Sequence, residues 1–193
     1  MTKKVLVVID VQNDFVDGSL GSKEALETIP NIVERIKKAD YDCILFTKDT
    51  HFDNYLETAE GKKLPVKHCI VGTPGHDLYP AVMAAIGEVE ETHHNIEHEI
   101  FEKCTFGSVE LVDYLCKYAI DKLDTTLGSE DKLDVEFVGF CTDICVVSNV
   151  LNLKASLYET ANISVNEKCC AGVTPETHAA AITTMKMCQI DIV

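Results

Sequence analysis

The sequence is short of basic residues, and it has no hydrophobic run long enough to cross a membrane. It contains 17 lysines and arginines against 32 aspartates and glutamates, a formal net charge of −15. This charge repels nucleic acid and anionic membrane surfaces, and it favours a small neutral ligand. No stretch approaches the roughly 20 apolar residues of a membrane span. From Met1 the chain runs into an apolar strand without a signal-peptide core, so we expect a cytoplasmic protein with no nucleic-acid or membrane partner.

The sequence also lacks a cysteine pair with the spacing of a zinc ribbon, although it contains nine cysteines. Cys141 and Cys145 are four positions apart, and Cys169 and Cys170 are adjacent, whereas such a ribbon needs two intervening residues. The number of cysteines is odd, and a chain of 193 residues can bury enough apolar surface to fold without disulfides. We therefore expect free thiols, most of them packed as small buried hydrophobes.

Apolar runs of strand length alternate with longer amphipathic segments along the chain. The strands are predicted at residues 5–9, 43–47, 98–102, 135–139 and 163–166. The helices are predicted at residues 22–39, with an interruption at Ile29-Pro30, and at 80–86, 108–118, 141–158 and 174–188. Apolar strands separated by helices indicate a parallel sheet covered on both faces. We predict one α/β domain over residues 1–193, a three-layer αβα sandwich with a mostly parallel sheet, and a surface excursion at residues 121–134.

Reactive side chains follow the predicted strands at the edge where an open α/β sheet gathers its functional groups. Asp10 follows the first strand directly, Lys103 follows the third and Cys145 follows the fourth. A carboxylate at the edge of a core is costly unless it is paired, hydrogen-bonded or used. In the first turn of a helix and beside Lys103, Cys145 would form a reactive thiolate, and Asp10 could carry its proton to a leaving group. The amide groups of Cys141 and Cys145 could form an oxyanion hole.

A second group of polar residues follows the second predicted strand. Asp49 and His51 are two positions apart in an extended segment, so both can face one side, and His68 returns after the loop 52–67. Two imidazoles and a carboxylate suit Zn²⁺, Mn²⁺ or Fe²⁺, although Asp49 and His51 could instead be hydrogen-bonding loop residues. Other histidines lie in an acidic stretch and are predicted to be surface residues: His93, His94 and His98.

Five short stretches, in this order, resemble the motifs of the isochorismatase-like cysteine hydrolases, and in particular of their nicotinamidase branch. They are VIDVQNDF, TKDTH, KHCIVGTPG, EKCTFGS and VGFCTDICV, and the resemblance covers nearly the whole chain. It implies a Rossmann-like αβα fold and a catalytic set of Asp10, Lys103 and Cys145. It also implies a cis peptide before Cys141 that turns this residue's N–H into the oxyanion hole. Because position 145 is a cysteine here, covalent amide hydrolysis is favoured over the vinyl-ether hydrolysis of the isochorismatases proper.

The same resemblance implies a divalent metal ion, most simply Zn²⁺, held by Asp49, His51 and His68. In nicotinamidases this metal holds the ring nitrogen of the substrate. Some relatives add a fourth protein ligand from the intervening loop, for which Glu60 is our candidate, ahead of Glu57.

The absence of tryptophan bears on the substrate. Many nicotinamidases place a tryptophan against the pyridine ring shortly before the third metal ligand, and Leu64 occupies this neighbourhood here. Phe15 could still cover a flat ring, and Phe140 is the third candidate substrate contact.

The favoured reaction is hydrolysis of nicotinamide to nicotinate and ammonia through a Cys145 thioester. Three alternatives stay open: a cysteine hydrolase of another small amide or carbamoyl compound, a metallohydrolase in which metal-bound water attacks, and a non-enzymatic binding relative. We also expect a homo-oligomer.

Overall fold

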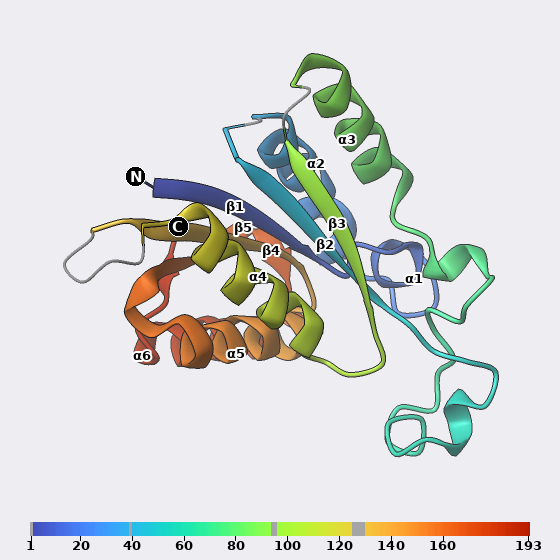
Figure 1. Cartoon of the computed structure of the whole chain (residues 1–193). Helices are drawn as coiled ribbons and strands as arrows, with labels where there is room; N and C mark the ends of the chain where they lie inside the picture. The colour runs from blue at the N-terminus through green and yellow to red at the C-terminus, as the bar shows by residue number, and fades with distance from the viewer. Residues whose placement is uncertain (1, 39, 94–95, 125–129) are drawn as a thin grey trace.

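A parallel sheet forms the middle layer of the fold (Figure 1). The computed structural model describes residues 2–38, 40–93, 96–124 and 130–193. Within these ranges the sheet has six strands in the order β3-β2-β1-β4-β5-β6, and all neighbouring strands pair in parallel. The strands are β1 (Thr2–Ile9), β2 (Cys43–Asp49), β3 (Glu97–Lys103), β4 (Lys132–Phe140), β5 (Ala161–Ala171) and β6 (Asp191–Ile192). The strand order reverses between β1 and β4, which is where such sheets bind ligands.

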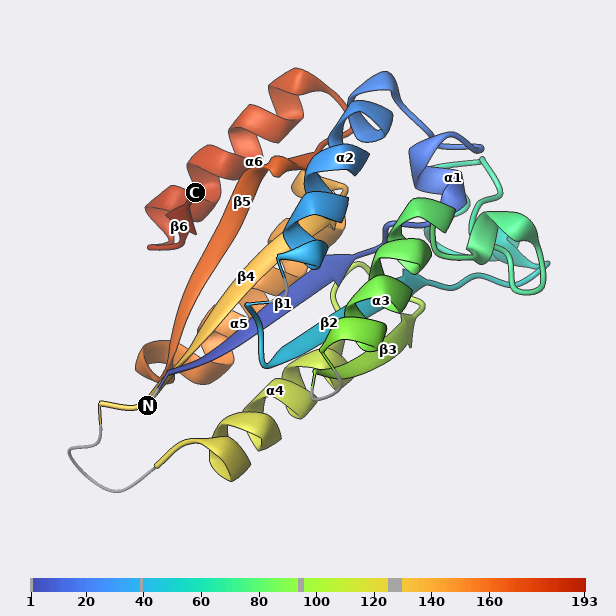
Figure 2. The same ribbon diagram turned by 90° about the horizontal axis from the view of Figure 1, so that it is seen from above.

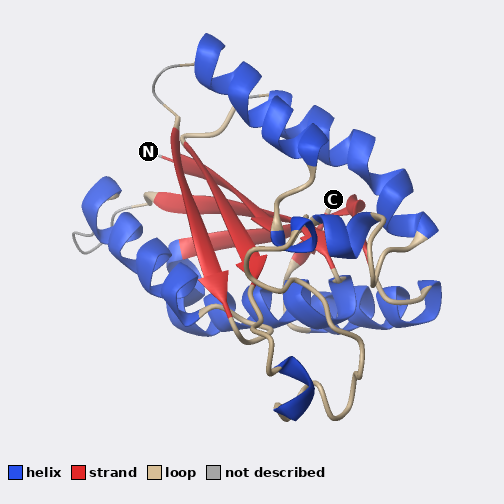
Figure 3. Cartoon of the chain, turned by 90° about the vertical axis from the view of Figure 1, so that its right-hand side faces the viewer, coloured by secondary structure: helices blue, strands red, loops and turns tan. Residues whose placement is uncertain are grey.

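Helices cover both faces of the sheet, as predicted. Helices α2 and α3 lie on one face, turned to the viewer in Figure 2, and α4, α5 and α6 lie on the other, so that Figure 3 shows the sheet between two helical layers. The helices are α1 (Asn13–Val16), α2 (Lys23–Lys37), α3 (Pro80–Thr92), α4 (Val109–Lys122), α5 (Val147–Leu157) and α6 (Pro175–Met187). Four short helical turns complete the set: η1 (Tyr55–Glu57), η2 (Pro74–His76), η3 (Thr142–Val146) and η4 (Tyr158–Thr160).

The first strand explains why the predicted strands are apolar throughout. All side chains from Val5 to Ile9 are fully buried. Alternate residues point to opposite faces: Val5 and Val7 pack with α4, α5 and α6, whereas Leu6 and Val8 pack with α2 and α3. A strand buried on both faces cannot alternate apolar and polar side chains.

Two boundary predictions are wrong. The predicted break at Ile29-Pro30 does not occur, because Pro30 lies inside α2 with its ring exposed while Ile29 and Ile32 are buried against the sheet. Burial of this apolar face outweighs the lost backbone hydrogen bond. The predicted helix 141–158 is divided into the π-helical turn η3 and the α-helix α5.

Other elements are longer than predicted, and one α-helix and one strand were not predicted. Helix α3 continues to Thr92 rather than ending at residue 86, and the charged segment 121–134 is shared between the end of α4 and the start of β4. Residues 125–129 of that segment lie outside the described residues. The short elements α1 and β6 carry too few residues to show a periodic pattern. No helix in the described part of the chain is long and apolar enough to cross a membrane.

Candidate active site and metal centre

Three of the predicted side chains meet beneath the carboxyl edge of the sheet. Lys103 ends β3, and its Nζ lies 2.6 Å from Asp10 Oδ2 and 3.6 Å from Cys145 Sγ. Asp10 follows β1 and Cys145 lies in η3, directly after β4. All three residues are at most 4% exposed. The sequence-predicted trio is therefore assembled around the lysine ammonium group.

Asp10 is held by the neighbouring strand as well as by the lysine. The Thr47 hydroxyl donates to Asp10 Oδ1 at 2.6 Å, and the Asp10 N–H donates to the Thr47 carbonyl at 3.2 Å. The backbone at Asp10 has φ +49°, a left-handed conformation that is uncommon away from glycine. Burial raises the pKa of Asp10, against the opposing charge of Lys103. Thr47 was not predicted, although the parallel register pairs it with Ile9.

The surroundings of Cys145 favour the neutral thiol over the thiolate. Burial and the negative charge of Asp10 raise the pKa of Cys145 well above its usual value, and the charge of Lys103 does not reverse this. Burial lowers the pKa of Lys103, but the negative charge of Asp10 outweighs it and raises that pKa, so the ammonium stays charged. The sequence predicted a reactive thiolate at Cys145, with Asp10 as the acceptor of the thiol proton. The raised pKa means that this proton has to leave before the sulfur can attack.

The turn that carries Cys145 has an unusual backbone. Cys145 lies in a π-helical turn rather than in the first turn of a regular α-helix. The peptide between Phe140 and Cys141 is cis, as the resemblance implies. Gly139 has φ +118°, and a Cβ atom there would lie 2.1 Å from the carbonyl oxygen of Ile9. Glycine is therefore required where β4 meets the end of β1.

Four donor groups converge beyond the carboxyl end of β2. They are Asp49, His51, Glu60 and His68, and their ligand atoms all lie within 4.8 Å of one another. Asp49 Oδ2 lies 2.9 Å from His51 Nε2 and 3.3 Å from His68 Nε2. Glu60 Oε1 lies 3.6 Å from His51 Nε2 and 3.7 Å from His68 Nε2. Glu57, the weaker candidate, is exposed and lies outside this group.

The geometry of this group fits a divalent metal ion. His51 Nε2 is buried and has no hydrogen-bond partner among the described residues, although the Asp49 carboxylate is 2.9 Å away. His68 Nδ1 lies 2.8 Å from the carbonyl oxygen of Val66, which leaves Nε2 directed at the other donors. Two imidazoles and two carboxylates that converge on one point are a donor set for Zn²⁺, Mn²⁺ or Fe²⁺.

Tyr55 supports the donor group and was not found from the sequence. It is fully buried, and its ring centroid lies 4.6 Å from that of His51 and 5.0 Å from that of His68. Its hydroxyl donates to the carbonyl oxygen of Leu64 at 3.0 Å. One aromatic residue in a polar loop gives no periodic pattern, so only the loop's path reveals this role.

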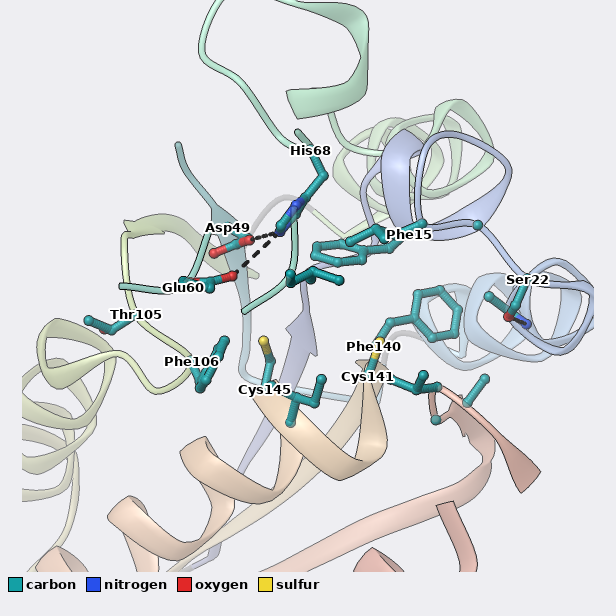
Figure 4. Close-up of a pocket in the computed structure, with 18 of the residues that line it drawn as sticks. Phe15, Ser22, Asp49, Glu60, His68, Thr105, Phe106, Phe140, Cys141 and Cys145 are labelled. Atoms are coloured by element: carbon teal, nitrogen blue, oxygen red, sulfur yellow. Dashed lines mark hydrogen bonds and ion pairs between the residues drawn. The ribbon is translucent and has the colours of Figure 1, made fainter. Parts of the chain in front are cut away.

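Cys145 and three of the four donors, Asp49, Glu60 and His68, line one cavity of about 690 Å³. Figure 4 shows the Cys145 sulfur between Phe106 and Phe15, with Glu60 and His68 above the sulfur in this view. The three predicted substrate contacts Phe15, Leu64 and Phe140 all line this cavity, and Phe106 is a further aromatic lining residue. The other lining residues are Leu20, Gly21, Ser22, Ala25, Ala59, Lys63, Cys104, Thr105, Cys141, Ile144, Ala171, Gly172 and Val173.

The remaining sequence expectations concern the cysteines as a group and the histidines of the acidic stretch. All nine cysteines are free among the described residues, as expected, and five of them are buried. His93 and His98 are exposed, as predicted, and His94 lies outside the described residues.

Comparison with known proteins gives consistent matches over the whole chain. The isochorismatase domain family model matches residues 4–193. The chain is 25% identical over 200 residues to the nicotinamidase/pyrazinamidase of Mycobacterium tuberculosis, with 98% of both chains covered. The solved pyrazinamidase/nicotinamidase of Streptococcus mutans superposes with a TM-score of 0.76 at 25% identity, covering 99% of this chain and 100% of that one. The pyrazinamidase of Pyrococcus horikoshii in complex with zinc superposes with a TM-score of 0.69 at 25% identity, covering 99% of this chain and 98% of that one.

Proposed function

This chain belongs to the isochorismatase family and to its nicotinamidase type, and from that premise we propose that it hydrolyses nicotinamide to nicotinate and ammonia. As a hydrolase of this type it acts on amide C–N bonds. One observation carries the proposal: Lys103 contacts both Asp10 and Cys145, and Cys145 lines a cavity that is also lined by three of the metal-binding donors, Asp49, Glu60 and His68. A cavity lined by both a buried thiol and metal donors suits a small ring that carries a carboxamide.

The proposed reaction begins with transfer of the thiol proton to Asp10. The Cys145 sulfur attacks the carboxamide carbon, and the oxygen of the resulting tetrahedral intermediate is stabilised by the amide groups of Cys141 and Cys145. Asp10 then donates the proton to the nitrogen as the C–N bond breaks, so ammonia leaves and a Cys145 thioester remains. Throughout, Lys103 keeps its positive charge beside the sulfur and the carboxylate.

Water completes the cycle. Asp10 accepts a proton from a water molecule that attacks the thioester carbon, and collapse of the second tetrahedral intermediate breaks the C–S bond. The proton returns from Asp10 to the Cys145 sulfur, and the released acid gives its own proton to solvent and leaves as nicotinate.

The four-donor group would hold the metal ion, for which we propose Zn²⁺. A bound divalent ion would supply an open coordination position for the ring nitrogen of the substrate. The donors of this chain, Asp49, His51, Glu60 and His68, fix where that position lies relative to Cys145. The relative from Pyrococcus horikoshii in complex with zinc supports the choice of metal.

A panel of amides tests the substrate assignment. Purified protein loaded with Zn²⁺ receives nicotinamide, pyrazinamide, benzamide or a small carbamoyl compound, and ammonia release is measured. We expect nicotinamide and pyrazinamide to be hydrolysed and benzamide to be inert, because benzamide has the same scissile bond but no ring nitrogen. If benzamide equals nicotinamide, or only the carbamoyl compound reacts, the nicotinamidase assignment fails. The second result would fit Leu64 in place of the tryptophan of many nicotinamidases.

Substitution of a donor sharpens this test. His68→Ala should raise KM for nicotinamide far more than it lowers kcat, because the lost contact is made in ground and transition states alike. A fall in kcat with KM unchanged would contradict a role of His68 in anchoring the substrate.

We further propose that the protein works in the cytoplasm as a homo-oligomer. The nine free cysteines fit a reducing compartment. At one edge of the sheet, β3 has a single strand neighbour, so its outer backbone groups could pair with a second copy. Sedimentation of a monomer at micromolar concentration would contradict the oligomer.

A further inference from the structure

Gln12 reaches the metal-binding segment, and its three side-chain hydrogen bonds all go to backbone groups. It is fully buried. Its Oε1 accepts from the Asp49 N–H at 2.7 Å, and its Nε2 donates to the carbonyl oxygens of Asp49 and His76, each at 2.9 Å. Gln12 therefore holds both backbone polar groups of Asp49, the N–H and the carbonyl, and ties them to the turn η2.

The sheet explains why Asp49 needs such a partner. On one side β3 pairs with β2 as far as Asp49 and Lys103. On the other side β1 ends at Ile9, opposite Thr47, so β1 does not pair with Asp49. The carboxamide of Gln12 takes the place that a continued β1 would have occupied.

Asp14 holds the second metal-binding segment in a similar way. Its Oδ2 accepts from the N–H of Cys69, the residue after His68, at 2.7 Å. A Cβ atom at Gly75 would lie 2.1 Å from this same carboxylate oxygen, so the contact is closely packed. Cys69 itself has φ +46°, so the backbone turns sharply just after His68.

We propose that Gln12 and Asp14 are positioning residues for the metal-binding group. Gln12 fixes the backbone that presents Asp49, and Asp14 fixes the turn that presents His68. The inference rests on the proposed metal role of this group and on no step of amide hydrolysis. Its physical basis is that the loop between these ligands has little regular structure, whereas metal donors must be held to within about 0.5 Å. Loss of such supporting contacts typically lowers metal affinity about 10- to 100-fold.

Asn149 provides a matched control on the other side of the cavity. It is also fully buried, and it also makes three hydrogen bonds to backbone groups. Its Oδ1 accepts from the Ser108 N–H at 2.8 Å, and its Nδ2 donates to the carbonyl oxygens of Phe106 at 3.1 Å and Cys145 at 2.8 Å. Removal of either side-chain amide removes three hydrogen bonds to backbone groups, but only Gln12 contacts a metal-binding segment.

The test compares Gln12→Met with Asn149→Leu, substitutions that keep the approximate side-chain volume and remove the hydrogen bonds. Zn²⁺ affinity is measured on metal-free protein by competition with a chelator, and the rate of Cys145 labelling by iodoacetamide is measured on the same samples. We expect Gln12→Met to weaken Zn²⁺ binding about 10- to 100-fold and to leave labelling within about twofold. Asn149→Leu should change labelling and leave Zn²⁺ affinity within about threefold. Equal losses of Zn²⁺ affinity in both variants, or none in Gln12→Met, would overturn the role of Gln12.

Variants of Asp14 provide a second comparison, which can be made even if Gln12→Met does not fold. Asp14→Ala should weaken Zn²⁺ binding about tenfold, and Asp14→Asn should restore most of it because the amide oxygen still accepts from the Cys69 N–H. Equal affinities in these two variants would overturn the role of Asp14. Both readouts are made without substrate, so failure of nicotinamide hydrolysis does not affect them. A wild-type protein that binds no Zn²⁺ would remove the positioning proposal and leave the chemistry of Cys145 standing.

Discussion

Two buried charge networks lie at opposite ends of the same sheet, and they differ in how completely their polar atoms are satisfied. At the carboxyl edge, Lys103 contacts Asp10 and Cys145 beside the cavity of about 690 Å³. At the amino end, Glu136 of β4 meets Arg35 of α2 beside a smaller cavity of about 290 Å³. Both networks join groups that are distant in sequence.

The amino-end network is fully satisfied. Glu136 Oε1 accepts from Arg35 Nε at 2.8 Å and from Asn166 Nδ2 at 3.0 Å. Glu136 Oε2 accepts from Arg35 and from the Tyr41 hydroxyl. The Arg35 guanidinium also lies 5.0 Å from the centroid of the Tyr41 ring.

The carboxyl-edge network leaves polar atoms available. Asp10 Oδ2 meets Lys103 as an ion pair, and neither it nor His51 Nε2 has a hydrogen bond among the described residues. A buried polar atom without a hydrogen bond is costly, so its retention beside a large cavity indicates a ligand or a reaction. The comparison teaches that satisfaction of the buried polar atoms, rather than the presence of buried charge, separates a functional network from a structural one.

The largest expected effect is the loss of turnover in Cys145→Ala. Removal of the nucleophile should lower kcat for nicotinamide roughly 10⁴-fold or more. Cys188→Ala, at an exposed position after α6, is the control and should behave as wild type. Ammonia release at saturating substrate measures both. Retained turnover in Cys145→Ala that a chelator abolishes would favour the metallohydrolase alternative.

The next largest effect should fall on stability, at the amino-end network. Glu136→Gln should lower the free energy of unfolding at pH 7 by about 3 kcal/mol, because it leaves Arg35 with no buried counter-charge. Cys145 labelling should not change. Urea unfolding followed by circular dichroism measures the difference in stability.

The loss of stability in Glu136→Gln should depend on pH, and the direction of this dependence follows from the pKa of Glu136. Burial raises the pKa of Glu136, but hydrogen bonds from Arg35, Asn166 and Tyr41 outweigh it, and the net pKa is lowered. A lowered folded-state pKa means that the stabilisation is fully present above the unfolded-state value of about 4.5 and is lost as the pH falls through the folded value. The difference in the free energy of unfolding between wild type and Glu136→Gln should therefore become smaller below about pH 4.5. A difference in the free energy of unfolding that stays constant from pH 7 to pH 3 would contradict a lowered pKa of Glu136 in the folded protein.

The two networks were not equally predictable from sequence. Asp10, Asp49, Lys103 and Cys145 could be identified because each one ends or follows a strand, and parallel strands bring their carboxyl ends to one edge. Glu136 lies inside an apolar strand, and its partner Arg35 is 101 positions away, so no local pattern connects them.

Loop geometry set a second limit on prediction. The candidate ligand Glu60 was found only through the family resemblance. The contacts of Tyr55 and Gln12 depend on the path of the loop after β2, and this loop has no periodic sequence pattern. In the fold, Pro30 was expected to break a helix because local propensity was given more weight than the burial of Ile29.

A smaller effect is expected on labelling of the nucleophile. Lys103→Met should slow iodoacetamide labelling of Cys145 at neutral pH by about 10- to 100-fold, because loss of the ammonium charge raises the pKa of the thiol further. Asp10→Asn should stop turnover because the proton carrier is lost. It should not slow labelling, because loss of the negative charge of Asp10 lowers the pKa of the Cys145 thiol. Arg35→Met, in the other network, is the control and should label as wild type. Unchanged labelling in Lys103→Met would remove the lysine from this role.

The smallest effect expected is that of Tyr41→Phe, which removes a single hydrogen bond from the satisfied network. The ring stays in place beside Arg35, so the change isolates the bond from the Tyr41 hydroxyl to Glu136 Oε2, whose length is 3.1 Å. Glu136 Oε2 keeps its contact with Arg35, so the carboxylate is not left unpaired. We expect the free energy of unfolding to fall by about 1 kcal/mol at pH 7, with turnover and Cys145 labelling unchanged. A loss as large as that of Glu136→Gln would mean that the hydroxyl, rather than the guanidinium, is the main partner of the carboxylate.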